Sequence, residues 1–346
     1  MFAMTISAYG AAEDVFTESQ LPKPEIRDDE VLVKIHATSV NPIEYKMREG
    51  YGRRVFSKKR RFEFPVALGN DVCGTIVSAG NKIHQFKTGD AVFAAPEVTG
   101  QGSYCEYRAI KASHCVPKPA NLSFTEAATL PYVVMTTWSA LITKTKLTPA
   151  DYQGKKVLVH GGSGGIGSFA IQLLKAWGAE VTTTCSGDKA KAVKALGADR
   201  VINYKTEDFS KSLSDVDLVL DTVGGEQEAP SLSVLKKNAN AHYVTLVFPA
   251  LANIDQYGFF KGALKTIITL ISKKRACKKQ GINYNWGMFK SCPEALEHIR
   301  ALVENGKIKA VVDHSYPLKQ LVEAHNYVES GQATGKVAVT VTNEAA

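Results

Sequence analysis

The chain has 346 residues, of which 45% are hydrophobic and 22% charged, so disorder as its main state is excluded. At roughly 150 residues per domain, this length predicts about two domains. Lys and Arg exceed Asp and Glu by 42 to 34, a formal charge of +8 that would suit anionic ligands. The chain has neither the ~18 consecutive apolar residues of a membrane-spanning helix nor the features of a secretory signal. We therefore expect no membrane span, and a cytoplasmic protein, or one of the mitochondrial matrix if an upstream presequence is missing from this chain.

The basic residues gather in two stretches, 53–61 and 256–293, and the second contains no acidic residue. We interpret both as solvated loops and helix faces. Nucleic-acid binding is disfavoured because Phe56 is the one aromatic residue within 53–61 and the charge elsewhere is mixed in sign. The six cysteines lack the paired C-x-x-C spacing of a zinc knuckle and are expected to be reduced core thiols.

The first third of the chain predicts short β-strands. Residues 31–36, 74–78 and 104–110 are rich in strand-forming side chains and are bounded by turn signals. This pattern predicts a compact, barrel-like domain. The character changes near residue 122, where Ser123 and Glu126 have the spacing of a capping box at the start of a helix. We place the end of this first part of the catalytic domain at residue 126, so that it covers residues 1–126.

Strand and helix patterns alternate over the next part of the chain. Strands are expected at 156–160, 180–184, 201–202, 217–220 and 242–247, with helices running to about 177 and 196. This rhythm predicts an α/β fold with a doubly wound parallel sheet, a Rossmann domain over residues 127–289. Residues 290–346 should return to the first domain, with helices at 293–305 and 318–329, a strand at 308–312 and a final strand at 337–341.

A Gly-rich turn joins the first strand of this alternation to its helix. Gly162, Gly164 and Gly167 have the spacing that permits a tight turn, approach of a pyrophosphate and close packing of helix on strand. Amide groups at the start of the helix would point at the anion. The sequence therefore predicts a dinucleotide cradle made by Gly162, Ser163, Gly164, Gly165, Ile166 and Gly167.

The end of the next strand distinguishes the two nicotinamide cofactors. An acidic residue there would bind the ribose 2′-hydroxyl of NAD, but residues 184–187 contain no carboxylate. Ser186 can instead hydrogen-bond a 2′-phosphate, and Lys189 can neutralise it. NADPH is therefore the predicted cofactor, with the neighbouring Asp188 as the residue that counts against it.

Ordered matches along nearly the whole chain identify a family resemblance. The matching segments are 39–44, 47–52, 64–71, 130–138, 162–167, 196–199, 221–225, 243–247 and 335–336. They resemble the medium-chain dehydrogenase/reductase superfamily, its zinc-free quinone oxidoreductase branch, and within that the mitochondrial reticulon-interacting oxidoreductases. The resemblance implies a split GroES-like catalytic domain around a Rossmann domain, an active site between them, and a homodimer.

The resemblance also implies roles for single residues. Ser186, Lys189 and Tyr204 keep the spacing of the side chains that hold a 2′-phosphate in quinone oxidoreductases. Family positions near the nicotinamide and its ribose correspond to Thr136, Leu246 and Val247. The positions of the zinc ligands of alcohol dehydrogenases correspond to Asn41, Asn70 and Asp71, a poor donor set for zinc, so no metal is expected.

Hydride transfer without a metal suits a quinone or an α,β-unsaturated carbonyl, because the charge spreads onto an oxygen that hydrogen bonds can stabilise. The predicted donors are Asn41 and Tyr51, with Arg48 and Lys46 as sources of positive charge. Simple structural roles are the alternatives: a turn residue at Asn41, a packing ring at Tyr51 and surface charges at the other two. Lys46 replaces a family tyrosine and Tyr51 falls one position early, so the source of the final proton stays open.

Two other functions are carried as alternatives. One is an enoyl reductase acting on a lipid or carrier-bound substrate, with residues 248–260 and 286–289 lining a long pocket. The other is an NADPH-binding scaffold with incidental activity. Substrate specificity is expected to depend on residues 53–64 and 248–289.

Overall fold

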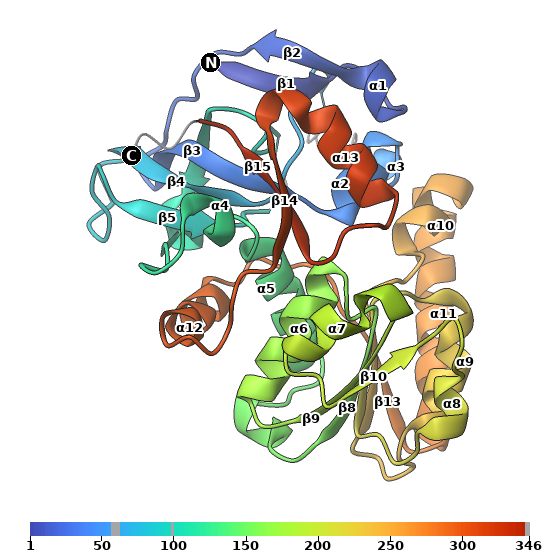
Figure 1. Cartoon of the computed structure of the whole chain (residues 1–346). Helices are drawn as coiled ribbons and strands as arrows, with labels where there is room; N and C mark the ends of the chain where they lie inside the picture. The colour runs from blue at the N-terminus through green and yellow to red at the C-terminus, as the bar shows by residue number, and fades with distance from the viewer. Residues whose placement is uncertain (57–62, 98–99, 343–346) are drawn as a thin grey trace. The chain divides into compact units, whose positions relative to one another are not determined.

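A computed structural model describes residues 1–56, 63–97 and 100–342 (Figure 1). It divides into two compact units, of which the first comprises Met1–Met135, Ser291–Asn305 and Ala310–Ala346. The second comprises Thr136–Lys290 and Gly306–Lys309. The first unit is thus built from both ends of the chain, and the second from its middle.

The first unit contains a seven-stranded sheet among the described residues, in the order β14-β15-β3-β4-β5-β7, with β6 paired to β3. A separate antiparallel pair joins β1 to β2. The strand bounds are β1 Phe2–Ile6, β2 Phe16–Gln20, β3 Glu30–Val40, β4 Val72–Ala79, β5 Ala91–Ala94, β6 Tyr107–Lys111, β7 Val116–Pro117, β14 Val312–Pro317 and β15 Lys336–Thr340. The expected strands at 74–78 and 337–341 are confirmed to within two residues, and the strand expected at 31–36 is present but continues to Val40. In contrast, 308–312 is not a strand, and β14 begins only at Val312.

The last strand, β15, pairs with the first long strand, β3. Val337 lies opposite Val40 and Thr340 opposite Ala37 in antiparallel register. This pairing places the start of β15 beside the end of β3, where helix α2 begins. Two segments almost 300 residues apart in the chain therefore meet at one point of the sheet.

Short helices flank this sheet. They are α1 Ala12–Val15, α2 Pro42–Arg48, α3 Arg53–Phe56, α4 Phe124–Ala127, α5 Pro131–Trp138, α12 Pro293–Glu304 and α13 Leu321–Glu329. The expected capping box is present at α4, where Ser123 accepts a hydrogen bond from the amide of Glu126. Helix α5 contains the point at which the first unit passes into the second.

The second unit is built on a six-stranded sheet in the order β10-β9-β8-β11-β12-β13, in which adjacent strands pair in parallel. The bounds are β8 Lys156–His160, β9 Glu180–Cys185, β10 Arg200–Asn203, β11 Leu218–Asp221, β12 Ala241–Thr245 and β13 Ile282–Trp286. The order runs outward from β8 in both directions, which is the Rossmann arrangement. The predicted doubly wound α/β fold is confirmed, and the central strands β11 and β12 are buried along their whole length.

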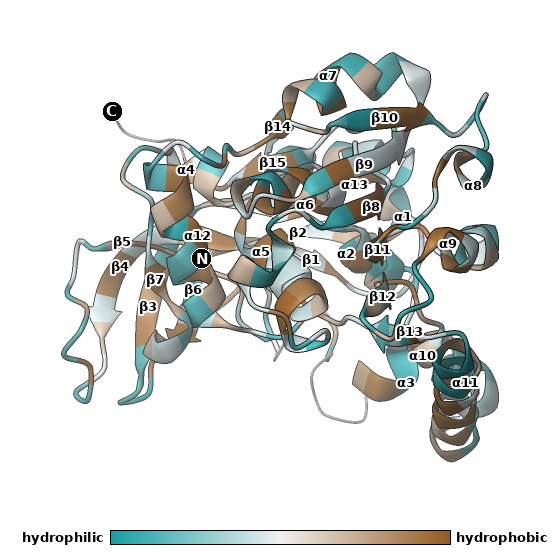
Figure 2. Ribbon diagram, turned by 90° about the horizontal axis from the view of Figure 1, so that it is seen from below, coloured by the Kyte–Doolittle hydropathy of each residue, from teal (hydrophilic) through white to brown (hydrophobic). Residues whose placement is uncertain are grey.

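The helices of this unit are α6 Gly165–Ala176, α7 Ala190–Ala195, α8 Phe209–Ser212, α9 Glu228–Val234, α10 Ala250–Tyr257 and α11 Phe259–Lys279. Helix α11 was not predicted as an element. Its approach to α10 is close, because a Cβ at Gly262 would lie 2.4 Å from the carbonyl oxygen of Asn253. Figure 2 shows both hydrophobic and hydrophilic segments along α11, which packs beside the edge strand β13.

Candidate active site

The Gly-rich turn has the geometry of a dinucleotide cradle. A Cβ at Gly162 would lie 2.1 Å from Thr183 Oγ1 on β9, and one at Gly167 would lie 2.1 Å from the carbonyl oxygen of Gly161. At Gly164 the nearest atom would be 3.5 Å away. Gly162 and Gly167 are therefore required by packing, whereas Gly164 borders space that a pyrophosphate can use.

Helix α6 begins at this turn without a side-chain cap. Gly164 is its N-cap and makes no side-chain hydrogen bond, so Gly165, Ile166 and Gly167 begin the helix with amide groups that have no partner inside it. Such amides, at the positive end of the helix dipole, attract a phosphate. Ser163 lies in the turn just before them.

The residues predicted to contact the nicotinamide and its ribose lie near the carboxyl ends of β11 and β12 and in α5. The amide of Leu246 donates to the carbonyl of Asp221 at 2.9 Å, and Val247, 44% exposed, follows it. Val247 packs so closely on Gly224 that a Cβ there would lie 2.9 Å from its own. Thr136 is buried and its hydroxyl has no hydrogen-bond partner among the described residues. An orphaned buried hydroxyl fits a ligand group such as a cofactor hydroxyl.

A buried pair of side chains supports the loop between β11 and α9, a feature that was missed at the sequence level. Asp221 accepts hydrogen bonds from the amides of Val223 at 2.9 Å and Gly224 at 2.8 Å. Its other oxygen accepts a 2.5 Å bond from the hydroxyl of Tyr243. The loop against which Val247 packs is thus held by a carboxylate at the end of the central strand β11.

The predicted 2′-phosphate residues lie at the ends of the neighbouring strands β9 and β10. The amide of Tyr204 donates to the carbonyl of Cys185, and that of Lys189 donates to the carbonyl of Ser186. Tyr204 is 57% exposed, and Ser186 and Lys189 are half-buried. The structure therefore brings together the backbone positions of all three residues.

Asp188 at the same place is ionised and held by its neighbours. Its pKa is lowered by a hydrogen bond from Ser186, by its own backbone, and by the charges of Lys205 and Lys189. Lys205 was missed at the sequence level, because only the pairing of β9 with β10 shows that it lies near Asp188. Two lysines therefore surround the one carboxylate that disfavours a 2′-phosphate.

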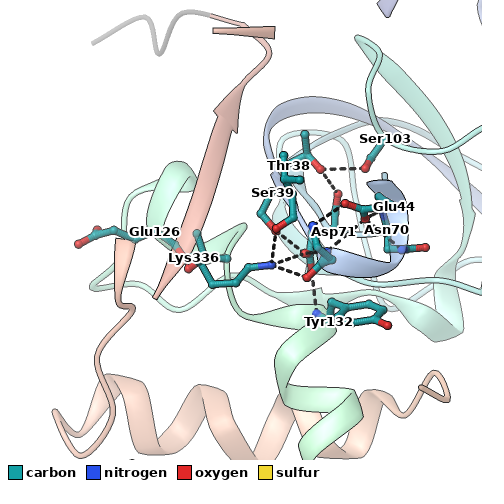
Figure 3. A network of polar contacts seen from close by, with 12 residues as sticks. Thr38, Ser39, Glu44, Asn70, Asp71, Ser103, Glu126, Tyr132 and Lys336 are labelled. Atoms are coloured by element: carbon teal, nitrogen blue, oxygen red, sulfur yellow. Dashed lines mark hydrogen bonds and ion pairs between the residues drawn. The ribbon is translucent and has the colours of Figure 1, made fainter. Parts of the chain in front are cut away.

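In the first unit, a buried polar network surrounds Asp71 (Figure 3). One carboxylate oxygen of Asp71 accepts hydrogen bonds from the Ser39 hydroxyl and, at 2.8 Å, from the Asn41 side-chain amide. The other accepts the backbone amide of Tyr132 at 2.6 Å. Asp71 is fully buried, so these contacts replace the water it has lost.

Lys336 supplies the positive charge of this network. Its ammonium donates to the side-chain oxygen of Asn41, lies 3.3 Å from the carbonyl of Val40 and 3.5 Å from a carboxylate oxygen of Asp71. The Lys336 side chain is 6% exposed and that of Asp71 is fully buried. The return of β15 to β3 thus places a buried cation next to the start of α2.

Glu44 forms the second negative centre. It accepts the Asn41 backbone amide at 2.6 Å, the Asn70 backbone and side-chain amides at 2.8 and 3.0 Å, and the Tyr104 hydroxyl at 2.8 Å. Burial, and secondarily the charge of Asp71, raises the pKa of this carboxyl, whereas Lys336 lowers it. All these partners donate, which is the pattern that an ionised carboxylate requires.

Tyr104 continues the network to His325. The His325 Nε2 lies 3.1 Å from the Tyr104 hydroxyl, and burial lowers the pKa of His325 to about 3. Because the Tyr104 hydroxyl donates to Glu44, the neutral imidazole must donate to Tyr104 through Nε2–H. His325 therefore donates a hydrogen bond to Tyr104, and Tyr104 donates one to Glu44, so both bonds point toward the carboxylate.

The predicted donor role of Asn41 meets a physical obstacle. Its side-chain amide donates to Glu44 at 3.1 Å and to Asp71 at 2.8 Å, which uses both of its N–H groups, and its oxygen accepts from Lys336. No N–H group is left for a substrate oxygen in this arrangement. Asn41 instead links the two carboxylates to the lysine.

Tyr51 and Arg48 lie at the opposite end of α2 from Asn41. Asn41 caps the start of α2, whereas Tyr51 lies half-buried in the turn beyond its end, so a helix of about 10 Å separates their backbones. Arg48 is buried, donates to the carbonyl of Gly10 at 3.1 Å and forms an ion pair with Glu329 at 2.9 Å. These contacts tie α2 to α13 and explain why Arg48 is buried.

The positions of the alcohol dehydrogenase zinc ligands do not fit that metal. Asn41, Asn70 and Asp71 offer amides and one carboxylate in place of thiolates and imidazole, and the ammonium of Lys336 already lies against Asn41 and Asp71. A second cation at that point would be repelled. Within the described ranges, no group of three His, Cys, Asp or Glu side chains could hold a metal ion.

The long-pocket interpretation of residues 248–260 and 286–289 stays a prediction. Phe248 is buried in the core of the second unit, and its ring lies 5.0 Å from that of Trp286, which is partly buried against this core. Phe259, Phe260 and Met288 are exposed. Most of the first segment forms α10. In the predicted specificity segment 53–64, residues 57–62 lie outside the described part of the chain.

Comparisons with known proteins agree with this architecture. Residues 27–120 match the family model described as alcohol dehydrogenase GroES-like domain, and residues 196–339 match the one described as zinc-binding dehydrogenase. The human protein named NAD(P)H oxidoreductase RTN4IP1, mitochondrial, is 41% identical, covering 99% of this chain and 89% of its own length. The tomato 2-methylene-furan-3-one reductase is 32% identical, covering 98% of this chain and 79% of its own.

A solved structure gives the same result. The quinone oxidoreductase of Coxiella burnetii superposes with a TM-score of 0.82 at 29% identity, covering 99% of each chain. No helix in the described ranges is both long and apolar enough to cross a membrane. The predicted resemblance is confirmed: the chain belongs to the medium-chain dehydrogenase/reductase superfamily, in its quinone oxidoreductase branch.

Proposed function

We propose that the protein transfers a hydride from NADPH to a quinone or an α,β-unsaturated carbonyl without a metal. The observation that carries this proposal is the Gly-rich turn at the start of α6, where a Cβ at Gly164 would meet its nearest atom only at 3.5 Å. The names of the relatives, an NAD(P)H oxidoreductase, a quinone oxidoreductase and a furanone reductase, support the same reaction class.

NADPH would bind with its pyrophosphate at Gly162–Gly167 and its 2′-phosphate at Ser186, Lys189 and Tyr204. Lys205 joins this set, because its charge acts on Asp188 in the same place. Thr136, whose hydroxyl lacks a partner in the described part of the chain, would hydrogen-bond the nicotinamide ribose, and Leu246 and Val247 would lie against the ring. The bound cofactor supplies the hydride, and the protein fixes where it is delivered.

The substrate oxygen gains negative charge during the transfer, so it needs a donor. We assign this role to Tyr51 and make Asn41 a positioning residue that holds Asp71, Glu44 and Lys336 together. Hydride addition gives the monoanion of a hydroquinone or an enolate, and water can supply the proton that neutralises either one. A homodimer formed through the edge strand β13 belongs to the same proposal, because an edge strand offers unpaired backbone groups.

The test is oxidation of NADPH, followed at its absorbance band, with a panel of quinones and enones. Lys189→Ala and Lys205→Ala should each weaken NADPH binding by about one to two decades, because a charge-assisted contact to a phosphate is lost, and should leave NADH binding nearly unchanged. Lys191→Ala is the matched control, since Lys191 is exposed on the neighbouring helix α7. Equal losses for both cofactors would refute the phosphate site.

Turnover separates the proposal from its alternatives. Wild-type protein that binds NADPH but reduces no compound of the panel would favour the scaffold function. Reduction confined to acyl chains on a carrier or thioester would favour the enoyl reductase. Rapid turnover of a simple quinone or enone supports the proposal.

A further inference from the structure

Helix α11 carries apolar side chains on two opposite faces. One face packs on its own unit: Gly262, Thr266 and Cys277 are buried, and Leu270 contacts the core of the Rossmann sheet. The other face is solvent-exposed over about three turns. It consists of Phe260 (84% exposed), Leu264 (58%), Ile267 (54%), Ile268 (58%) and Ile271 (43%), which we call the outer stripe.

The spacing of the outer stripe is helical. Its members follow one another at intervals of four, three, one and three residues, so they form one continuous ridge. Most proteins expose large apolar side chains singly, whereas here five of them form one contiguous exposed patch on a helix face. Such a ridge indicates a binding surface.

Basic side chains follow the outer stripe toward the C-terminal end of α11. Lys274, Arg275, Lys278 and Lys279 are exposed in the last two turns of α11, and we call them the basic end. Lys274, Arg275 and Lys278 follow Ile271 by three, four and seven residues, so they lie on the same face as the outer stripe. Residues 256–293 contain no acidic side chain that could neutralise them.

The inner lysine of the helix behaves differently. Lys273 is half-buried and forms an ion pair with Glu228 on α9. It lies on the packed face, where it secures α11 to its own unit. The contrast shows that the protein pairs the inward charge and leaves the basic end exposed to solvent.

We propose that the outer stripe and basic end of α11 bind the surface of an anionic lipid membrane. The helix would lie parallel to the surface, with the outer stripe among the upper acyl chains and the basic end at the lipid phosphates. A membrane offers an apolar layer and negative charge along one plane, which is the combination that this face complements. This inference is independent of the proposed reductase activity.

A second copy of α11 is a poorer match. It would present the same apolar and basic side chains, and neither the outer stripe nor the basic end contains an acid to receive the lysines. Contact between the two helices would bury the apolar ridge but leave the basic end unsatisfied. Charge complementarity therefore favours anionic lipid.

The experiment is sedimentation of the full-length protein with vesicles of neutral phosphatidylcholine, or of phosphatidylcholine containing one-third phosphatidylglycerol. We expect binding to the anionic vesicles, little binding to the neutral ones, and release as the salt is raised, because the surface potential is screened. Lys274→Gln, Arg275→Gln and Lys278→Gln together should lower the partition coefficient on the order of a hundredfold, at about one decade or slightly less per charge.

Two further variants complete the design. The control Lys144→Gln, Lys146→Gln and Lys307→Gln removes the same charge from exposed positions of the second unit and should bind like wild type. Leu264→Gln with Ile268→Gln keeps good helix formers and should also abolish binding, because the apolar anchor is lost. Unchanged NADPH binding verifies that each variant is folded.

Several results would overturn the proposal. One is wild-type protein that stays in the supernatant with anionic vesicles at low salt. Another is an equal loss of vesicle binding in the control triple variant, which would show that net charge alone determines the binding. A third is conversion of a dimer to a monomer by Leu264→Gln with Ile268→Gln, measured by sedimentation velocity without lipid, which would assign the outer stripe to a second copy.

Discussion

Replacement of Lys336 by Met tests the buried network. The substitution keeps the length of the side chain but removes the ammonium that lies 3.5 Å from Asp71, where the two side chains are 6% and 0% exposed. At that distance and an effective dielectric constant of about 20, the lost attraction is about 5 kcal/mol. Loss of one partner of a buried pair costs roughly 3–5 kcal/mol in comparable cases. We expect a loss of about 4 kcal/mol in the free energy of unfolding.

The assay is thermal unfolding by calorimetry, in which this loss corresponds to a fall of roughly 8–16 °C in Tm for a unit of this size. Lys82→Met is a matched control, because Lys82 lies at the same 3.5 Å from Asp28 but both side chains are more than half exposed. An exposed pair contributes about 0–1 kcal/mol. Equal effects of the two substitutions would refute the reasoning.

The effect of Lys336→Met should also depend on pH. Burial raises the pKa of Glu44 above its ordinary value of 4.5 in the folded protein, and Lys336 opposes that rise. Since the folded state then binds more protons than the unfolded state, stability falls as the pH rises above about 4.5. Without Lys336 the pKa of Glu44 rises further, so this fall extends to higher pH, and the substitution should cost more at pH 8 than at pH 5. A cost that stays constant over this range would contradict the assignment of Lys336 to the carboxylates.

Three further outcomes are expected. Gly164→Ala should retain wild-type stability and lose cofactor affinity in a fluorescence titration, because a Cβ there would lie at an ordinary 3.5 Å from the carbonyl oxygen of Gly161. Gly167→Ala should lower Tm, because its Cβ would lie only 2.1 Å from the same oxygen, and similar stability of the two variants would be inconsistent with the cradle. Tyr51→Phe should lower turnover of the best quinone about a hundredfold while leaving NADPH affinity unchanged, and an unchanged rate would place the donor elsewhere. Turnover should be indifferent to chelators, and metal analysis that finds one tightly held zinc per chain would contradict the amide-rich donor set.

The dinucleotide turn was predictable because its requirements are local. A strand, three spaced glycines and a helix lie within about 20 consecutive residues, and the close approach at Gly167 is to backbone atoms of the turn itself. The parallel sheet was predictable for a related reason, since each β-α-β unit is continuous in sequence. These features depend little on distant parts of the chain.

The buried network could not be derived in the same way. Asp71 and Lys336 are 265 residues apart, and only the pairing of β15 with β3 brings them together. From the sequence, the side-chain amide of Asn41 was expected to donate a hydrogen bond to the substrate, because neither Glu44 nor Lys336 was assigned as its partner. Helix α11 was not predicted for a different reason. Because apolar side chains lie on two of its faces, its sequence lacks the apolar periodicity on a single face that indicates a surface helix.

The position of β15 has a consequence for synthesis of the chain. On the ribosome, the lysine that balances Asp71 and Glu44 is made 265 residues after Asp71. The Rossmann unit, whose sheet is complete by Trp286, can form its hydrogen-bonded core while the rest of the chain is still being translated. The first unit cannot pair these two carboxylates with their lysine until β15 has been made. A nascent chain arrested before Lys336 should therefore contain a protease-resistant nucleotide-binding unit followed and preceded by cleavable segments.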